Sequence, residues 1–154
     1  MTFEFRSASR SDAGAISKLA IDTCEKFIFP DSSPDGRSNL ENLYSQENLK
    51  SLMQAGHRFL ISRLGDELVG AVAMNSEDRR IFLMFVAELF QRQGLGKMLI
   101  TQLLASEIEQ KIVTLNSSLF AREFYRDLGF TVCGPVKRNQ GIDYQPMKLS
   151  RGVL

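Results

Sequence analysis

The stretch "FLMFVAELFQRQGLGKML", residues 82–99, joins an apolar run to the start of a helix, with two glycines at the junction. The apolar run is typical of a buried strand, and the apolar residues after Gly94 recur at helical spacing. Arg92 and Lys97 flank the pair Gly94 and Gly96. The first N–H groups of a helix lack intrahelical partners and carry partial positive charge. We therefore expect this junction to bind an anion, and phosphate is the natural guest.

The common phosphate-binding motifs do not fit this junction. A P-loop would require glycine at the position of Gln91 and serine or threonine at the position of Met98. A dinucleotide-binding fingerprint would require a third glycine where Leu99 stands, and it should follow its strand at once. Nucleoside triphosphates and dinucleotides are therefore poor candidates. A tight strand-to-helix turn without a ligand is the structural alternative.

Outside this stretch, apolar periodicity and turn residues predict an alternation of strands and helices. Strands are expected at 3–6, 57–63, 67–75, 79–87, 112–116, 130–134 and 142–149, and helices at 9–29, 39–55, 94–110 and 117–128. Ser11 is expected to cap the first helix, and residues 30–38 are expected to form a loop. A strand–helix–strand unit predicts one parallel pair in an otherwise antiparallel sheet. The fold class is α/β (α+β), with helices on both faces of one mixed sheet.

Composition limits the classes of function. The formal net charge is +1, with 19 basic and 18 acidic residues, which argues against nucleic acid or an anionic membrane as the main partner. The longest apolar run, 81–87, is too short to span a bilayer, and no signal peptide is recognisable, so we expect a cytoplasmic protein. Cys24 and Cys133 lack CxxC spacing and His57 is the single histidine, so we expect no metal site.

Two segments together resemble the GNAT superfamily of N-acetyltransferases, in particular its small bacterial members. The acetyl-CoA motif of that family, [QR]-x-x-G-x-[GA], is matched by Gln91, Gly94 and Gly96. Residues 115–130, "LNSSLFAREFYRDLGF", resemble the second signature, in which A-x-x-F-Y precedes L-G-F. Residues 141–149 are similar to the closing strand of the family. One departure is Glu88, which stands where many members have proline.

The resemblance implies a single GNAT-like domain, residues 1–154, with a splayed central parallel strand pair. The strand ending at Phe85 and Val86 would part from its parallel neighbour at Leu115 and Asn116, and the pantetheine arm of acetyl-CoA would lie in the gap like an added strand. The pyrophosphate would bind the amides before and at the helix start. The implied cofactor-binding residues are Phe85, Val86, Gln91, Arg92, Gln93, Gly94, Leu95, Gly96, Lys97, Asn116, Ser118 and Tyr125. Asn116 or Ser118 could equally cap the next helix.

The implied reaction is direct transfer of an acetyl group from acetyl-CoA to a primary amine. Tyr125 is the candidate general acid, because a phenol with a reference pKa of about 10 keeps its proton at neutral pH and can protonate a thiolate. The structural alternative is a tyrosine that only packs. A backbone N–H near Val86 would stabilise the oxyanion. Glu88 is one candidate base; Glu77, Asp78, His57 or an ordered water are others.

The acceptor would bind between the first helix–loop–helix region and the last hairpin. Phe29, Asp31 and Tyr44 are candidate substrate contacts, although the aromatic residues could equally be core and the aspartate a turn former. The resemblance leaves the acceptor open, as a small-molecule or a peptide amine, and allows a homodimer. A non-catalytic acyl-CoA binding or sensing module is the alternative function. It would keep the glycine junction and lose the acid, so the presence of Tyr125 favours an enzyme.

Overall fold

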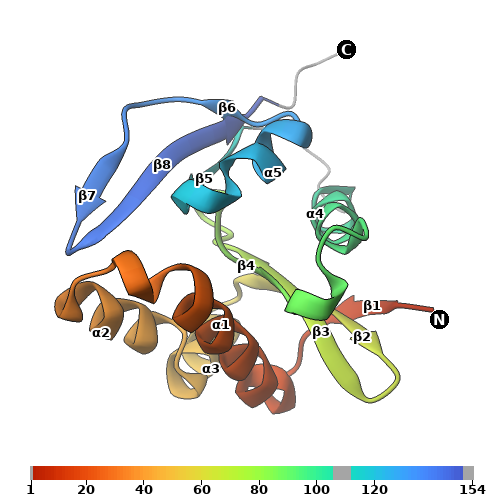
Figure 1. The fold of residues 1–154 in the computed structure, drawn as a ribbon. Helices are drawn as coiled ribbons and strands as arrows, with labels where there is room; N and C mark the ends of the chain where they lie inside the picture. The colour runs from red at the N-terminus through yellow and green to blue at the C-terminus, as the bar shows by residue number, and fades with distance from the viewer. Residues whose placement is uncertain (1, 106–111, 151–154) are drawn as a thin grey trace.

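The structure is a computed structural model that describes residues 2–105 and 112–150 (Figure 1). The elements, with η denoting short 3₁₀ helices, are β1 (Glu4–Ser7), η1 (Arg10–Asp12), α1 (Ala13–Phe27), η2 (Phe29–Asp31), α2 (Pro34–Leu43), α3 (Gln46–Gln54), β2 (Arg58–Leu64), β3 (Glu67–Met74), β4 (Arg80–Val86), η3 (Glu88–Phe90), α4 (Leu95–Ala105), β5 (Val113–Ser117), η4 (Leu119–Ala121), α5 (Arg122–Asp127), β6 (Thr131–Val132), β7 (Lys137–Asn139) and β8 (Ile142–Leu149).

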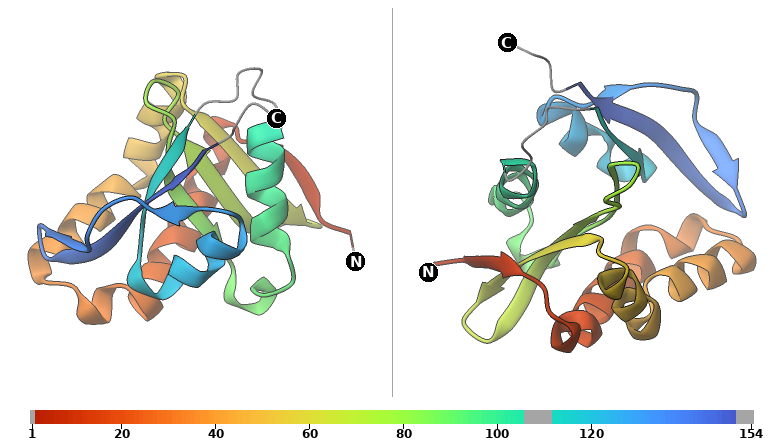
Figure 2. Two further views of the ribbon diagram at one scale, coloured as in Figure 1. Left: turned by 90° about the horizontal axis from the view of Figure 1, so that it is seen from above. Right: turned by 180° about the vertical axis from the view of Figure 1, so that it is seen from behind.

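The described strands form one mixed sheet in the order β1-β2-β3-β4-β5-β8-β6, and β7 pairs with β8. The pair β4–β5 is parallel, and the other pairs are antiparallel. Helices α1 to α3 cover one face of the sheet, and α4 and α5 cover the other (Figure 2). The predicted fold class is therefore confirmed, including the parallel pair inside a mostly antiparallel sheet.

Each face of the sheet carries its own apolar core. On the α1–α3 face, the cluster includes Ile16, Ala20, Cys24, Leu49 and Leu83, each at most 1% exposed. On the α4–α5 face, the cluster includes Leu95, Leu99, Leu103, Val113 and Phe130, each at most 2% exposed. Strands that bury side chains on both faces read as near-continuous apolar runs, which explains the run in β4.

Helix α4 lies unusually close to β3 because β3 carries a glycine at the crossing. A Cβ added to Gly70 would lie 2.8 Å from Leu99 Cδ1 and 2.6 Å from Ser62 Oγ. A larger side chain there would have to displace the side chains of Leu99 and Ser62. The contact fixes the height of α4 above the sheet, and with it the position of the glycine junction at the helix start.

Three predictions at the N-terminal side of the chain are wrong. Residues 34–38 belong to α2, because the Ser33 hydroxyl accepts a hydrogen bond from Gly36 N at 3.0 Å and Pro34 occupies the first helical position. The polar region after it is two helices, since Ser45 caps a separate α3 through Asn48 N at 3.1 Å. Ser11 does not cap α1; it lies inside η1, which begins after Ser9.

The C-terminal predictions need smaller corrections. The connection between the last two predicted strands contains a strand of its own, β7, which pairs with β8 across a turn at Gln140 and Gly141. The helix predicted at 117–128 is split into η4 and the short α5, and Ser117 belongs to β5. The predicted end of the α4 helix at 110 lies outside the described residues.

Candidate functional site

Strands β4 and β5 pair at one end and separate at the other. Their parallel register contains two pairs, Arg80 with Thr114 and Ile81 with Leu115. Beyond Ile81, the remainder of β4 pairs with β3 alone. The β3–β4 register shifts at this same point, which leaves Phe82 as an extra residue in β4. Such a bulge bends a strand and increases its twist, so it explains why the two strands part here.

The bulge also decides which backbone groups of β4 face the gap. Ala87 N donates to Val69 O on β3 at 2.8 Å, so Ala87 faces β3. Residues of an antiparallel strand alternate in this respect, so Phe85 also directs its backbone groups at β3. Met84 and Val86 therefore direct N–H and C=O groups toward the gap. The sequence alone indicates Phe85 and Val86 as the residues at this end of β4, whereas the structure directs the backbone of Met84 and Val86 at the gap, because no local pattern in the sequence marks a bulge.

The loop between β4 and α4 is tied back to the open end of β4. Gln91 Nε2 donates to Val86 O at 3.0 Å. Arg92 and Gly94 have φ values of 64° and 82°, so the backbone passes twice through the left-handed region. A Cβ added at Gly94 would meet nothing within 4 Å, so this glycine is required for its conformation and leaves open space above the loop.

The second glycine has a different physical role. A Cβ at Gly96 would lie 2.8 Å from Phe124 Cζ on α5 and 2.9 Å from Met84 Cε on β4. Leu95 beside it is 1% exposed. The first turn of α4 is therefore held between α5 and β4 by close packing. Its free N–H groups lie at the mouth of the gap, where a helix start favours an anion.

The polar side chains of the loop are at the surface. Arg92, Gln93 and Lys97 are exposed. Gln93 Nε2 donates to Leu89 O at 3.1 Å, which stabilises the loop itself. Arg92 and Lys97 are two cations beside a helix start, and Gly94 leaves open space above it. These features fit the diphosphate of coenzyme A. The gap between the strands, with the backbone groups that face it, fits an extended pantetheine arm.

Tyr125 lies on the α4–α5 side and is 8% exposed. Its ring packs edge-on against Phe124 and Phe130, with ring centroids 5.0 and 5.7 Å apart. Burial raises the pKa of its phenol above the ordinary value, so it stays protonated at neutral pH. Among the described residues its hydroxyl has no hydrogen-bond partner. A protonated phenol with its donor unused is suited to donate a proton.

Asn116 and Ser118 lie at the end of β5 and directly after it. Asn116 is exposed and stands opposite Pro146 of β8, inside the strand, so it is not a helix cap. Ser118 precedes η4, and within the described chain its side chain makes no capping hydrogen bond. Neither residue shows the capping role that was the alternative to a cofactor contact.

The end of α1 contacts the segments that follow both splayed strands. Lys26 forms an ion pair with Glu88 of η3, after β4. Phe27 stacks on Phe120 of η4, after β5, with ring centroids 4.9 Å apart. Glu88, the candidate base, is therefore exposed and paired.

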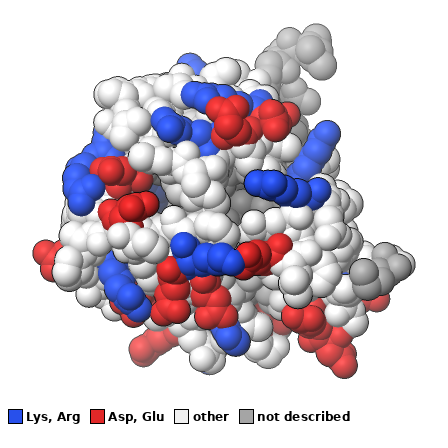
Figure 3. Space-filling view, viewed as in Figure 1, with Lys and Arg blue, Asp and Glu red and all other residues white. Residues whose placement is uncertain are grey.

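On the face shown in Figure 3, basic and acidic side chains alternate around a hollow near the centre.

The three candidate substrate contacts have different surroundings. Asp31 is exposed in η2. Phe29 is 6% exposed, and the guanidinium of Arg37 lies over its ring at 4.8 Å. Tyr44 is 8% exposed, packs edge-on against Phe85 and donates from its hydroxyl to Phe82 O at 3.0 Å. The two aromatic residues are core residues, so Asp31 is the one whose side chain is free to meet a solute.

The two regions expected to bound the acceptor site touch each other. Ser33 N donates to Gly141 O at 3.1 Å, and Asn39 Nδ2 donates to Gln140 Oε1 at 2.7 Å. A Cβ on Gly141, whose φ is 80°, would lie 1.7 Å from Ser33 Oγ. The start of α2 and the β7–β8 turn therefore meet on that side of the molecule, as Figures 1 and 2 show.

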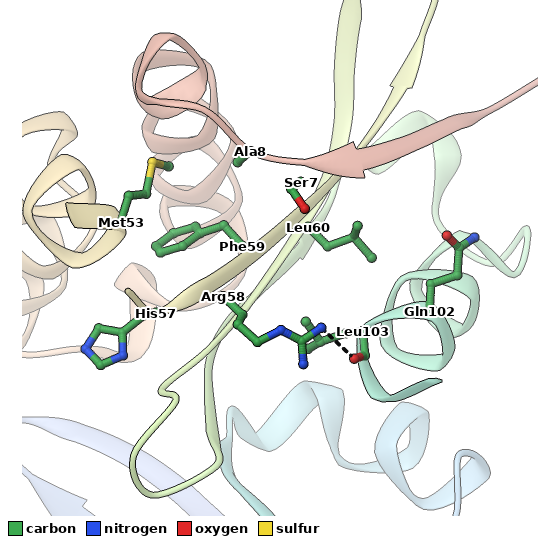
Figure 4. A pocket seen from close by; sticks show the side chains of 9 residues that line it. All are labelled: Ser7, Ala8, Met53, His57, Arg58, Phe59, Leu60, Gln102 and Leu103. Atoms are coloured by element: carbon green, nitrogen blue, oxygen red, sulfur yellow. Dashed lines mark hydrogen bonds between the residues drawn. The ribbon is translucent and has the colours of Figure 1, made fainter. Parts of the chain in front are cut away.

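His57, another residue weighed as a base, is engaged elsewhere. Its Nδ1 accepts a hydrogen bond from Ser76 N at 3.1 Å, which anchors the β3–β4 connection. It borders a cavity of about 450 Å³ between β2, α3 and α4, in which Arg58 donates to Leu103 O at 3.0 Å (Figure 4). None of the candidate cofactor-binding residues lines this cavity.

Two further findings concern residues 2–105 and 112–150. None of their helices combines the length and the apolar character needed to cross a membrane. Their His, Cys, Asp and Glu side chains form no group of three that could hold a metal ion.

Comparison with known proteins gives the same fold. A GCN5-related N-acetyltransferase from Rhodopseudomonas palustris matches with a TM-score of 0.79 at 21% identity, over 97% of this chain and 96% of that one. PaiA N-acetyltransferase from Thermoplasma acidophilum, in complex with coenzyme A, matches with a TM-score of 0.79 at 17% identity, over 97% and 99%. The ribosomal-protein-S18-alanine N-acetyltransferase from Escherichia coli matches with a TM-score of 0.72 at 16% identity, over 99% and 96%.

A family model places the chain in a family as well as a fold. The model of the acetyltransferase (GNAT) domain matches residues 28–151, which is most of the sequence. That range contains the motif formed by Gln91, Gly94 and Gly96 and the segment 115–130, on which the resemblance is based. The chain belongs to the GNAT family of acetyltransferases.

Proposed function

We propose that this protein transfers the acetyl group of acetyl-CoA directly to a primary amine. The observation that carries the proposal is the parallel pair β4–β5, which separates after Ile81 and leaves Met84 and Val86 facing the gap. A helix start with two positive-φ residues before it lies at the mouth of that gap. A solved structure of similar fold, PaiA, is a complex with coenzyme A.

The proposed reaction assigns a role to the residues at the helix start, in the gap and on α5. Acetyl-CoA supplies an acetyl thioester, which is an activated acyl donor. The amides of residues 92–97, with Arg92 and Lys97, would hold the pyrophosphate. The N–H groups of Met84 and Val86 would bond the pantetheine arm and stabilise the negative charge on the thioester oxygen. Tyr125 would hold a proton on its phenolic oxygen and deliver it to the sulfur that leaves.

Glu88 is the base that we propose to test. Its carboxylate lies in η3, directly after β4, and pairs with Lys26. As the base, Glu88→Gln would lower kcat by about a hundredfold, since general base catalysis contributes roughly that factor or more. Lys26→Met is the matched control, because it breaks the same ion pair and keeps the carboxylate. A wild-type rate in both Glu88→Gln and Lys26→Met would exclude Glu88 and leave Glu77, Asp78, His57 or an ordered water as the base.

The acceptor is a small-molecule or peptide amine that enters on the α1–α3 side. The exposed Asp31 would attract a cationic amine there. The cysteines Cys24 and Cys133 are free, which fits the cytoplasm as the compartment that we propose. A homodimer is compatible with this arrangement.

Release of the coenzyme A thiol in the presence of an amine panel tests the function. The panel should contain polyamines, amino acids, aminoglycosides and peptides with free N-termini. We expect one class to raise thiol release well above the amine-free rate. Binding of acetyl-CoA without acceleration by any amine would instead support the acyl-CoA binding module. Absence of a thermal shift at millimolar acetyl-CoA would contradict both functions.

A further inference from the structure

The hydroxyl of Tyr44 is bonded to the strand that opens the gap. Tyr44 follows α2 as its C-terminal cap residue, far from β4 in the sequence. Its hydroxyl donates to Phe82 O at 3.0 Å, and its ring packs edge-on against Phe85, with centroids 5.2 Å apart. The residue is 8% exposed, so both its hydroxyl and its ring are engaged inside the protein. A buried phenol with both its ring and its donor engaged has one fixed position.

Phe82 is the residue whose carbonyl most needs such a partner. It is the extra residue at the bulge, opposite neither Ala73 nor Met74 of β3. The parallel ladder to β5 stops one residue earlier, at Ile81. A backbone carbonyl inside a protein is almost always hydrogen-bonded. Without the phenol, the Phe82 carbonyl would most readily regain a hydrogen-bond partner if this part of β4 moved toward β5. That movement would lengthen the parallel ladder and narrow the gap.

The phenol acts from the face opposite to the candidate acid. Tyr44 belongs to the core cluster of α1–α3, and Tyr125 belongs to the cluster of α4 and α5. Burial is the main cause that raises the pKa of Tyr44, so its hydroxyl keeps its proton and remains a hydrogen-bond donor at neutral pH. The two phenols therefore lie in separate core clusters, on opposite faces of the sheet.

We propose that Tyr44 is a positioning residue whose hydroxyl holds the bulge at Phe82 and thereby sets the direction of the Met84 and Val86 N–H groups in the gap. The proposal rests on acetyl-CoA being the ligand of that gap. It assigns Tyr44 a role in cofactor affinity, which differs from the acceptor contact expected from the sequence. The substitution Tyr44→Phe tests it directly, because it removes the hydroxyl and keeps the ring on Phe85.

The decisive readout is the dissociation constant of acetyl-CoA, measured by calorimetry alongside the melting temperature. We expect Tyr44→Phe to raise the dissociation constant by about tenfold, because the N–H groups no longer point at the ligand. The matched control is Ile16→Val, a fully buried position in the same core cluster that has no bond to β4. It should lower the melting temperature comparably and leave the dissociation constant within about twofold.

Amide hydrogen exchange in the free protein gives a second measurement. In Tyr44→Phe, the amide of Leu83, which lies beside the bulge and faces β3, should exchange faster relative to the rest of β4, whereas Ile16→Val should raise exchange throughout its core. An unchanged dissociation constant in Tyr44→Phe, or an equal rise in both variants, would overturn the positioning role. Failure of the wild-type protein itself to bind acetyl-CoA would overturn the proposed function, and the positioning role with it.

Discussion

The side-chain amide of Gln91 donates a hydrogen bond to the carbonyl of Val86 at 3.0 Å. The bond joins the start of the loop that contains Gly94 to the last residue of β4, across the short helix η3. It also satisfies a carbonyl at the open end of the gap and leaves the N–H of the same residue available to a ligand. The loop before α4 and the splayed strand are therefore held together by this bond.

Truncation of Gln91 should weaken acetyl-CoA binding. We expect Gln91→Ala to raise the dissociation constant by about fivefold, because the loop loses its tie to β4. Gln93→Ala is the comparison: that side chain bonds to Leu89 O on the loop's own surface, and truncation keeps the Gln93 backbone N–H. Its effect should be smaller. A larger loss in Gln93→Ala than in Gln91→Ala, measured by calorimetry, would argue against the tie.

The two glycines of the junction should respond differently to alanine. Gly96→Ala places a Cβ 2.8 Å from Phe124 Cζ, so we expect a loss of about 1–3 kcal/mol in the free energy of unfolding. Gly94→Ala meets open space and adds mainly the cost of a positive φ, about 1 kcal/mol. Urea denaturation measures both. Equal destabilisation would show that packing between α4 and α5 does not distinguish the sites.

Stability at low pH should depend on one ion pair at the start of α1. Arg6 binds Asp12 through two bonds of 2.8 and 2.9 Å and is the main cause that lowers the pKa of Asp12 to about 2, from 3.8. A lowered carboxyl pKa stabilises the folded state at pH values above the pKa that Asp12 has in the unfolded chain. This stabilisation is lost as the pH falls toward the folded pKa of about 2.

Asp12→Asn should therefore be less stable than the wild type by about 2 kcal/mol at neutral pH. The difference should shrink as the pH falls below 3.8 toward the folded pKa of about 2. Asp22→Asn is the control, because the Lys18–Asp22 pair is exposed and should contribute little. Urea unfolding across the acid range checks this; a difference that does not vary with pH would contradict the ion pair as its source.

Tyr125→Phe separates catalysis from binding. The ring keeps its contacts with Phe124 and Phe130, so affinity for acetyl-CoA should be retained. Turnover should fall by about tenfold or more, because the leaving sulfur loses its proton donor. Thiol release and calorimetry on the same preparation give both quantities. An unchanged rate would remove Tyr125 from the mechanism and leave it as a packing residue.

The sequence predicted those parts of the molecule that local patterns determine. The buried strand β4, the glycine junction, α1 and the closing strand β8 follow from apolar periodicity and turn residues. Pro34 was read as part of a loop, although a proline after a serine is also a helix start. The bulge at Phe82 and its bond to Tyr44 could not be predicted, because both depend on register between segments far apart in the chain.

We expect acetyl-CoA to bind between β4 and β5 with its diphosphate at the start of α4. A titration of the ¹⁵N-labelled protein with acetyl-CoA, followed through backbone amide shifts, tests this placement. We predict that the largest shifts fall on Met84, Val86 and residues 92–97. Shifts confined to the cavity around His57 and Arg58, or no shifts at millimolar acetyl-CoA, would contradict it.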